Sequence, residues 1–401
     1  MFEIHLDNWE LTPELSLLLD ISLRRGTRIP AELDWDRFEA ALRQHRVQPL
    51  LIRGLRSMDA QLVETHPTLR KYRGQQNKYT MESLQRLQAL AQVGSALADA
   101  GIRMLSMKGP LLSLELYGDP SLRTSRDLDV LVPEEELHRA GEILKTLGYE
   151  QEVTLFHKTP LRFKYYNCIE SEKHMVFNRG DICLELHWKS NYQTRDSFDA
   201  LWERREEQPI LGGKLAILGR EDRYSALIIH AAEHAFHRLR WLLDLYELQK
   251  KPYFSWGEAY RQLSDQGMGE LLLETLLVMY RLGLPGLEDV AFEGVSLTRQ
   301  DGGICLQLSD RLAQQGRRAV ELCEAVYPMW QSEAKWGDPR QRAHDRLLPV
   351  SLIRKSPLQK LLLACGPSVH ELALIDLPDW LFWLYFLIRP VHWLWRKLTG
   401  K

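Results

Sequence analysis

Several protein classes are excluded by what this chain lacks. Its 401 residues include only five cysteines, and no two of them are spaced as a paired metal-binding or redox motif. Scattered cysteines are typical of free thiols in a reducing compartment, so we expect a cytoplasmic protein. The first residues, MFEIHLDNWE, lack the basic and apolar regions of a signal peptide, which favours the same compartment.

A surplus of charge is also missing. The chain carries 52 Lys and Arg against 54 Asp and Glu, a formal net charge of −2 at pH 7. Without a positive excess, no global attraction to nucleic acid is expected, and any RNA or DNA contact would need a local basic patch. Apolar residues reach 45% of the chain, enough for a large core, and the length predicts two or three domains.

Two aspartates at the start of an apolar run are the most informative feature that is present. The segment SRDLDVLVP places Asp127 and Asp129 two positions apart. Alternate side chains of a strand share a face, so both carboxylates would point the same way, about 7 Å apart. Paired carboxylates suit a hard cation such as Mg²⁺, and they can also hold two metals for a phosphoryl displacement.

A turn suited to phosphate precedes these aspartates. Residues 102–107 predict a short strand and residues 111–116 a short helix, with Lys108 and Gly109 between them. Such a turn directs backbone N–H groups toward an anion, and the lysine adds a positive charge. Two guanidinium groups of the kind that binds phosphate stand just before the aspartates: Arg123 and Arg126.

A third acid follows downstream. The segment DICLELHWK, residues 181–189, predicts a strand with an apolar face and a polar face. Glu185 and His187 lie on the polar face, where Glu185 could act as a third carboxylate beside the two aspartates.

Hydrophobic periodicity divides the chain into three regions. Residues 1–98 have helical spacing, residues 99–215 alternate short apolar runs with turns, and residues 216–401 are helical again apart from a loop expected at 286–303. Within the middle region, PEEELHRAGEILKTLGY predicts one helix that ends at Gly148.

Taken in order, the turn, the paired aspartates and the later acid resemble the nucleotidyltransferase superfamily with the DNA polymerase β-like fold. The stretch from MKGPLL through YGDPSLRTSRDLDVLV to LELHW is most similar to largely uncharacterised bacterial nucleotidyltransferases, and the similarity extends over most of the chain. The resemblance implies an α+β fold, with a polymerase β-like core and a small mixed sheet between two helical regions. We expect the N-terminal helical region at 1–98, the core at 99–215 and the C-terminal helical domain at 216–401.

The resemblance also implies an activity. It implies transfer of a nucleoside monophosphate from an NTP, such as ATP, to an acceptor, with Mg²⁺ or Mn²⁺ and with release of pyrophosphate. Small molecules, sugars, peptides, proteins and RNA ends all remain open as acceptors. The residues implied as catalytic and metal-binding are Asp127, Asp129 and Glu185. The residues implied as nucleotide contacts are Lys108, Gly109, Arg123, Arg126, His187, His234 and Arg238.

Two departures from the superfamily pattern concern the triphosphate. Pro110 follows Gly109, where the superfamily usually has a second Gly or a Ser, and proline has no N–H to donate. The distance in sequence from Gly109 to Asp127 is also longer than in minimal members. Pro110 favours one alternative, a degenerate nucleotide-binding scaffold, whereas retention of all three acids argues against it. Another alternative is a nucleotide-sugar glycosyltransferase that uses the DxD, although a larger parallel sheet would then be expected before it.

A histidine motif gives a further alternative. His230, Glu233 and His234 match H-x-x-E-H, the zinc motif of inverted zinc peptidases. The histidines at i and i+4 share a helix face, so a zinc site is geometrically possible. We favour instead a helix that packs on the catalytic core, with Asp244 in the next segment as a structural partner.

The C-terminal segment is rich in tryptophan. Residues 379–401 predict a helix that is apolar nearly all round, which Pro390 should end or kink. The apolar run is too short to span a bilayer, which needs ~20 residues. We expect this segment to fold back onto the helical domain, and the alternative is a weak contact with a membrane surface.

Overall fold

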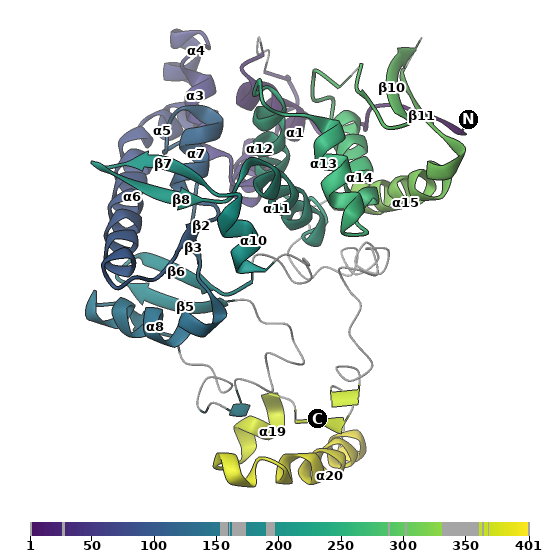
Figure 1. Cartoon of the computed structure of the whole chain (residues 1–401). Coiled ribbons are helices and arrows are strands. Elements are labelled where there is room, and N and C mark those ends of the chain that lie inside the picture. The colour runs from purple at the N-terminus through teal and green to yellow at the C-terminus, as the bar shows by residue number, and fades with distance from the viewer. Residues whose placement is uncertain are drawn as a thin grey trace.

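A computed structural model describes residues 2–25, 29–152, 159, 161–162, 174–189, 197–287, 289–300, 303–330, 361–362, 365–367 and 369–399. The described chain is an α+β protein with two separate sheets, a seven-stranded mixed sheet and a four-stranded antiparallel sheet. Figure 1 shows the larger sheet beside the N-terminal helices, and the smaller sheet at the other end of a helical array.

The larger sheet forms the core of the middle region. Its strand order is β4-β5-β6-β3-β2-β8-β7, and β3 runs parallel to β6 while β2 and β3 are antiparallel. The strands are β2 (Leu105–Ser106), β3 (Asp127–Leu131), β4 (Glu150–Gln151), β5 (His174–Arg179), β6 (Ile182–His187), β7 (Glu206–Ile210) and β8 (Gly213–Ile217). The expected mixed sheet is therefore confirmed.

One face of this sheet is covered by helices. The side chains of Leu128 and Val130 on β3 and of Leu184 on β6 pack in one apolar core. The same core takes residues from α6 (Gln76–Asp99) and from α8 (Leu137–Thr146), the helix predicted to end at Gly148. Because alternate residues of a strand point to opposite faces, the acids between these leucines and valines lie on the other face, where Leu131 packs against α10 (Phe198–Glu203) and α11 (Arg220–Glu233).

The helices from the two ends of the chain share one core. The N-terminal helices are α1 (Pro13–Leu23), α2 (Trp35–His45), α3 (Gln48–Leu55), α4 (Ala60–Thr65) and α5 (Pro67–Arg73). The helices within and after the large sheet are α7 (Pro110–Tyr117), α10 (Phe198–Glu203), α11 (Arg220–Glu233), α12 (Leu239–Gln249), α13 (Trp256–Asp265), α14 (Gly269–Arg281) and α15 (Ala313–Trp330). Leu18 of α1 and Leu51 of α3 belong to the same buried cluster as Ile228 of α11 and Leu272 of α14.

Four strands lie where helix and loop were expected. β1 (Phe2–Leu6) pairs with β11 (Gly303–Leu308), and β10 (Val295–Gln300) lies between β11 and β9 (Ala291–Phe292). Helical N-terminal residues and a loop at 286–303 were therefore wrong predictions. The physical reason is that β1 is five residues long and finds its partner about 300 positions away, so no local periodicity reveals the pairing.

The C-terminal segment forms a small unit of its own, the C-terminal unit. It consists of α19 (Val369–Leu374), a short 3-10 turn at Asp379–Leu381 and α20 (Leu384–Thr399). Its hydrophobic core contains Leu372, Phe382 and Tyr385. The unit lies apart from the helical domain in Figure 1 (yellow), so the prediction that it folds back onto that domain was wrong. None of the helices in the described part of the chain is both long enough and apolar enough to span a membrane.

Pro390 lies inside α20 and does not end it, so of the two expected effects only a kink stays a prediction. Proline removes one helical hydrogen bond, but interactions on both sides can hold the helix together. Here Glu371 of α19 contacts Arg389 Nη1 at 3.2 Å and His392 Nδ1 at 2.5 Å, one residue before and two residues after the proline.

Candidate active site

Three carboxylates meet on the face of the large sheet opposite α6 and α8. β3 and β6 are parallel neighbours, and their register sets Asp129 opposite Glu185 and Asp127 opposite Cys183. Asp127, Asp129 and Glu185 therefore share a face, as the alternation in both segments had indicated. We call these three residues the acid cluster.

A buried histidine lies within the acid cluster. His187 Nε2 is 3.2 Å from Asp129 Oδ1 and 3.2 Å from Glu185 Oε2, and the side chain is almost fully buried. An imidazole nitrogen carries at most one proton, so His187 Nε2 cannot donate fully to both carboxylates. The geometry places His187 beside the acids, where it fixes the positions of two of them.

A second histidine completes this group and was missed in the sequence. His174 on β5 pairs with His187 across the strands, with ring centroids 4.8 Å apart and Nε2 3.8 Å from Glu185 Oε2. His174, Glu185 and His187 each offer a ligand atom within 4.8 Å of the others, so they could hold a cation. Only the pairing of β5 with β6 brings His174 here, because no spacing rule links residue 174 to the acids.

The electrostatics of the acid cluster favour a bound cation. Burial raises the pKa of Asp127, and the charges of Asp129 and Glu185 raise it further, while Lys108 opposes them. Burial also acts to raise the pKa of Asp129, but Lys108 and the hydrogen bond with His187 outweigh it and lower that pKa. Repulsion among these acids is the kind of cost that a divalent cation relieves.

The predicted phosphate turn has the expected form. Gly109 is the N-cap of α7 with φ 80° and ψ −150°, a conformation that essentially only glycine adopts. Pro110 occupies the first turn of the helix, where the missing N–H breaks no helical hydrogen bond, so this departure is compatible with the turn. Lys108 lies close enough to lower the pKa of both Asp127 and Asp129.

Arginines from three segments gather near Asp127. We call Arg46, Arg126, Arg238 and Arg240 the arginine group. Burial lowers the pKa of Arg238 to about 10, with the charges of Arg240 and Arg126 adding to the effect. Burial and the same kind of repulsion, from Arg238 and Arg126, lower the pKa of Arg46 to about 10. Closely packed cations of this kind form a site for a polyanion.

Arg46 and Arg240 were missed in the sequence. Arg46 has φ 54° at the C-terminal end of α2, and Arg240 lies in the first turn of α12. Thr124 links them, since its hydroxyl donates to Arg46 O at 3.3 Å and its carbonyl accepts from Arg240 Nη1. The sequence gives only a weak signal for these two arginines. Arg240 follows Arg238 by two positions in the segment RLR, and nothing in the sequence distinguishes Arg46 from the other basic residues.

Arg123 makes a buried ion pair with α12. Its side chain is buried and its Nε donates to Asp244 Oδ2 at 2.8 Å, while Tyr117 donates to Asp244 Oδ1 at 2.8 Å. Asp244 is fully buried, as its expected structural role suggested. The pair ties the segment before β3 to α12, so Arg123 has a structural role, and its contact with phosphate stays a prediction.

Breaking this buried pair should be costly. Asp244→Ala leaves the Arg123 charge buried and unpaired, and we expect the free energy of unfolding to fall by about 3–5 kcal/mol. Urea unfolding measures this change. The double variant Arg123→Met with Asp244→Leu serves as control and should recover most of the loss, because it leaves no unpaired charge. An Asp244→Ala protein as stable as the parent chain would contradict the assignment.

The histidines of the H-x-x-E-H motif lie beside the ring of Trp241. α11 ends at Glu233, and His230 and His234 pack against the Trp241 ring, with centroids at 5.2 Å and 5.1 Å. Among the described residues, the groups that could hold a metal do not include either histidine. Arg238 also lies over the Trp241 ring at 5.2 Å, and His234 lies in this aromatic cluster rather than among the acids.

Comparison with solved structures found distant likenesses. The antibiotic-resistance factor ANT(2'')-Ia shares 13% identity over 41% of this chain and 83% of its own, with a TM-score of 0.31. A nucleotidyltransferase-like protein from Paracoccidioides brasiliensis shares 15% identity over 50% of this chain and 93% of its own, with a TM-score of 0.30. A tRNA nucleotidyltransferase solved with a primer tRNA and an ATP analog shares 12% identity over 75% of this chain and 91% of its own, with a TM-score of 0.24. TM-scores this low do not establish a shared fold. The comparison with curated proteins found no significant match.

The family comparison is decisive. A family model described as "Uncharacterised nucleotidyltransferase" matches residues 31–282, well over half of the chain. The matched range contains the phosphate turn, the acid cluster and the arginine group. The match to a nucleotidyltransferase family argues against the glycosyltransferase alternative. The chain belongs to this nucleotidyltransferase family, and it is an enzyme of nucleotidyl transfer with a polymerase β-like core.

Proposed function

We propose that this protein transfers a nucleoside monophosphate from an NTP to an acceptor, with a divalent cation at the acid cluster and with release of pyrophosphate. One observation carries the proposal. Asp129 and Glu185 face each other on parallel strands, with Asp127 on the same face, and all three lie next to a group of arginines. Oxygen ligands for a hard cation and cations for a polyphosphate are thus adjacent.

The residues present fit a divalent cation. Asp127, Asp129 and Glu185 supply carboxylate oxygens. The raised pKa of Asp127 reflects burial first and then repulsion from the other two acids, and a cation would relieve that repulsion. Mg²⁺ or Mn²⁺, when bound, would stabilise negative charge on the phosphates during displacement. His187 would hold Asp129 and Glu185 in position, and its neighbour His174 adds a nitrogen ligand that suits Mn²⁺ better than Mg²⁺.

The triphosphate would lie between the turn and the arginine group. Lys108 and the backbone at Gly109 approach from the large sheet, and Arg238 and Arg240 approach from the start of α12. Arg46 arrives from α2, so residues outside 99–215 contribute to the nucleotide site. We propose 99–215 as the catalytic core, with the shared helical core supplying the opposite wall of the site.

Arg238 offers a test of the nucleotide site. Arg238→Gln removes one cation from the arginine group, and we expect the Kd for NTP to rise roughly 10-fold, which corresponds to about 1.4 kcal/mol. The apo protein should remain as stable, because the repulsion that depresses the pKa of its neighbours is reduced. Isothermal titration calorimetry with each NTP measures the change. Arg70→Gln on α5, an exposed arginine away from this group, is the matched control.

The decisive experiment measures pyrophosphate. The chain is incubated with each NTP, Mg²⁺ or Mn²⁺ and pooled cell extract as the source of acceptor. We expect cation-dependent pyrophosphate release and labelled product from an NTP carrying an α-phosphate label. Tight NTP binding without any pyrophosphate, under all cations and extracts, would favour the scaffold alternative instead.

A further inference from the structure

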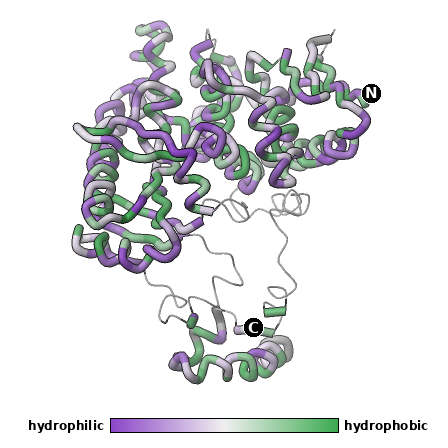
Figure 2. The backbone as a smooth tube through the Cα atoms, viewed as in Figure 1, coloured by the Kyte–Doolittle hydropathy of each residue, from purple (hydrophilic) through white to green (hydrophobic). Residues whose placement is uncertain are grey.

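The C-terminal unit presents its apolar side chains to solvent. Four apolar residues recur at spacings of three and four and so form one stripe: Trp383 just before α20, and Leu387, Val391 and Leu394 within it. They are well exposed, and Val391 reaches 69%. Trp380, just before α20, is 75% exposed, and Trp393 and Trp395 are also exposed. Figure 2 shows hydrophobic residues along much of this helix.

Three polar side chains of the same helix point inward: Tyr385, Arg389 and His392. Glu371 of α19 is buried and contacts both Arg389 and His392 of α20. Tyr385 is fully buried, and its hydroxyl donates to Ile375 O and accepts from Leu377 N at 3.0 Å. A helix on the surface of a soluble protein normally has the opposite arrangement, with its apolar stripe toward the core.

This orientation is held by specific contacts from the rest of the chain. Arg162 is fully buried, and its Nη2 lies 2.7 Å from Asp376 Oδ1, 2.8 Å from Leu377 O and 3.0 Å from the Tyr385 hydroxyl. The outward stripe therefore belongs to a defined packing arrangement.

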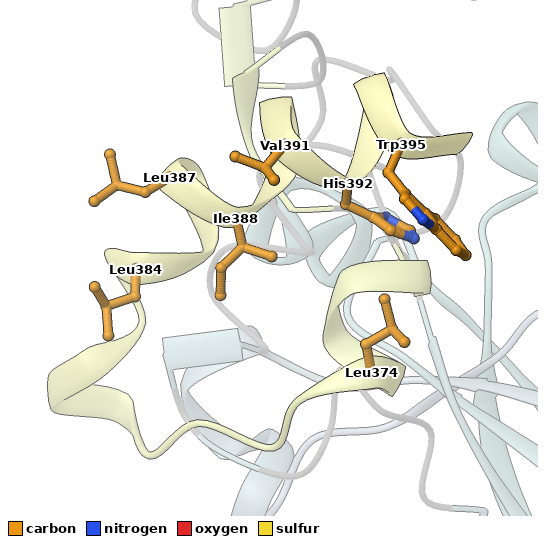
Figure 3. A pocket seen from close by; sticks show the side chains of 7 residues that line it. All are labelled: Leu374, Leu384, Leu387, Ile388, Val391, His392 and Trp395. Atoms are coloured by element: carbon orange, nitrogen blue, oxygen red, sulfur yellow. The ribbon is translucent and has the colours of Figure 1, made fainter. Parts of the chain in front are cut away.

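A groove runs between the two helices of the unit. Figure 3 shows its lining, with Leu374 from α19 and Ile388, His392 and Trp395 among the side chains from α20. The groove has a volume of about 540 Å³ and is lined by apolar side chains apart from His392. An apolar groove that continues an exposed apolar stripe suits hydrocarbon chains.

We propose that this face of the C-terminal unit binds the surface of a lipid bilayer, with the stripe of α20 at the boundary between headgroups and acyl chains. Four tryptophans are among the exposed side chains, and tryptophan favours that boundary because its ring is apolar and its N–H is polar. After Asp379 the sequence contains no acid and four basic residues, of which Arg389 pairs with Glu371 and three follow later in the sequence: Arg396, Lys397 and Lys401. Basic residues beside an apolar stripe favour anionic lipid.

The charge argues for lipid over a second copy of this chain. Two copies meeting stripe to stripe would bring their basic segments together, and like charges across an interface oppose association. An anionic bilayer offers the complementary charge. This inference concerns where the enzyme lies and is independent of the proposed reaction.

Vesicle flotation tests the proposal. The full chain is mixed with vesicles of phosphatidylcholine alone, or of phosphatidylcholine and phosphatidylglycerol in equal parts, and the floated fraction is measured. We expect flotation with both, and stronger flotation with the anionic vesicles that decreases with salt. The triple variant Trp383→Gln, Leu387→Gln and Val391→Gln should bind at least about 10-fold more weakly, because each change removes apolar surface from the bilayer.

The matched control substitutes equally exposed apolar residues in other parts of the chain. Met81→Gln with Leu211→Gln changes side chains that are 57% and 61% exposed, and it should float like the parent chain. Circular dichroism checks that the triple variant keeps its helices, which is expected because its inward contacts are untouched. Equal flotation of the triple variant, or no flotation of the parent chain, would overturn the proposal. A concentration-dependent dimer in sedimentation, lost in the triple variant and without flotation, would assign the face to a second copy.

Discussion

Asp129→Asn is expected to reduce nucleotidyl transfer by about 10³-fold or more while the protein stays folded. The carboxylate lies opposite Glu185 and beside His187, so it would be a central ligand of the cation. Losing several kcal/mol of charge stabilisation in the transition state corresponds to a rate loss of this size. Steady-state pyrophosphate release measures kcat, and the thermal unfolding midpoint shows that the fold is retained.

Asp127→Asn should remove activity to a similar extent, but its effect on stability differs. Burial and the neighbouring acids raise the pKa of Asp127, so its stabilising contribution is present at low pH and is lost as pH rises through the raised pKa. At neutral pH the ionised carboxylate therefore destabilises the cation-free protein. We expect the asparagine variant to have an equal or higher Tm without metal, and to gain less stability than the parent chain when Mg²⁺ or Mn²⁺ is added.

The control for both variants is Asp181→Asn. Asp181 is an exposed acid in the turn before β6, outside the acid cluster, and this variant should keep full turnover and the metal-dependent gain in Tm. Full turnover in Asp127→Asn or Asp129→Asn would contradict the metal assignment.

Glu185→Gln is the second change with a large expected effect. We expect turnover to fall by roughly 10²–10⁴-fold, while the Kd for NTP changes little. The reason is spatial. Glu185 contacts His187 and faces Asp129 on the sheet, whereas the proposed triphosphate contacts come from the phosphate turn and from the arginine group on other segments.

Separate measurements of binding and chemistry test this prediction. Calorimetry measures the Kd for NTP, and single-turnover kinetics measure the chemical step. Cys183→Ser, on the same face of β6 and opposite Asp127, is a suitable control for disturbance of the strand. A Glu185→Gln protein that loses affinity for NTP but keeps its chemical step would contradict the role of a third acid.

Local patterns in the sequence were sufficient for the acid cluster and the phosphate turn. A strand alternates its faces with a period of two, so apolar neighbours determine where Asp127, Asp129 and Glu185 point. Gly109 followed by a helix-starting proline is likewise a local signal, and the structure has Gly109 at positive φ there. The order of these motifs was enough to indicate the family that the match over residues 31–282 established.

Contacts between distant segments could not be predicted in the same way. Strand pairing brings His174 to the site, and helix packing brings Arg46 there. Arg123 forms an ion pair with Asp244, which lies 121 positions away in the sequence. The strand at Phe2–Leu6 has the same cause, since its partner lies near the other end of the chain.

The C-terminal segment shows the limit most clearly. The sequence determined that residues 379–401 are apolar, aromatic and basic, and hydrophobicity alone predicts burial. It could not determine which face of α20 turns inward, because that depends on the partners available to the polar groups. Glu371 forms ion pairs with Arg389 and His392, and Arg162 donates a hydrogen bond to Tyr385, so these polar side chains face inward. The apolar stripe on the other side of α20 therefore faces solvent.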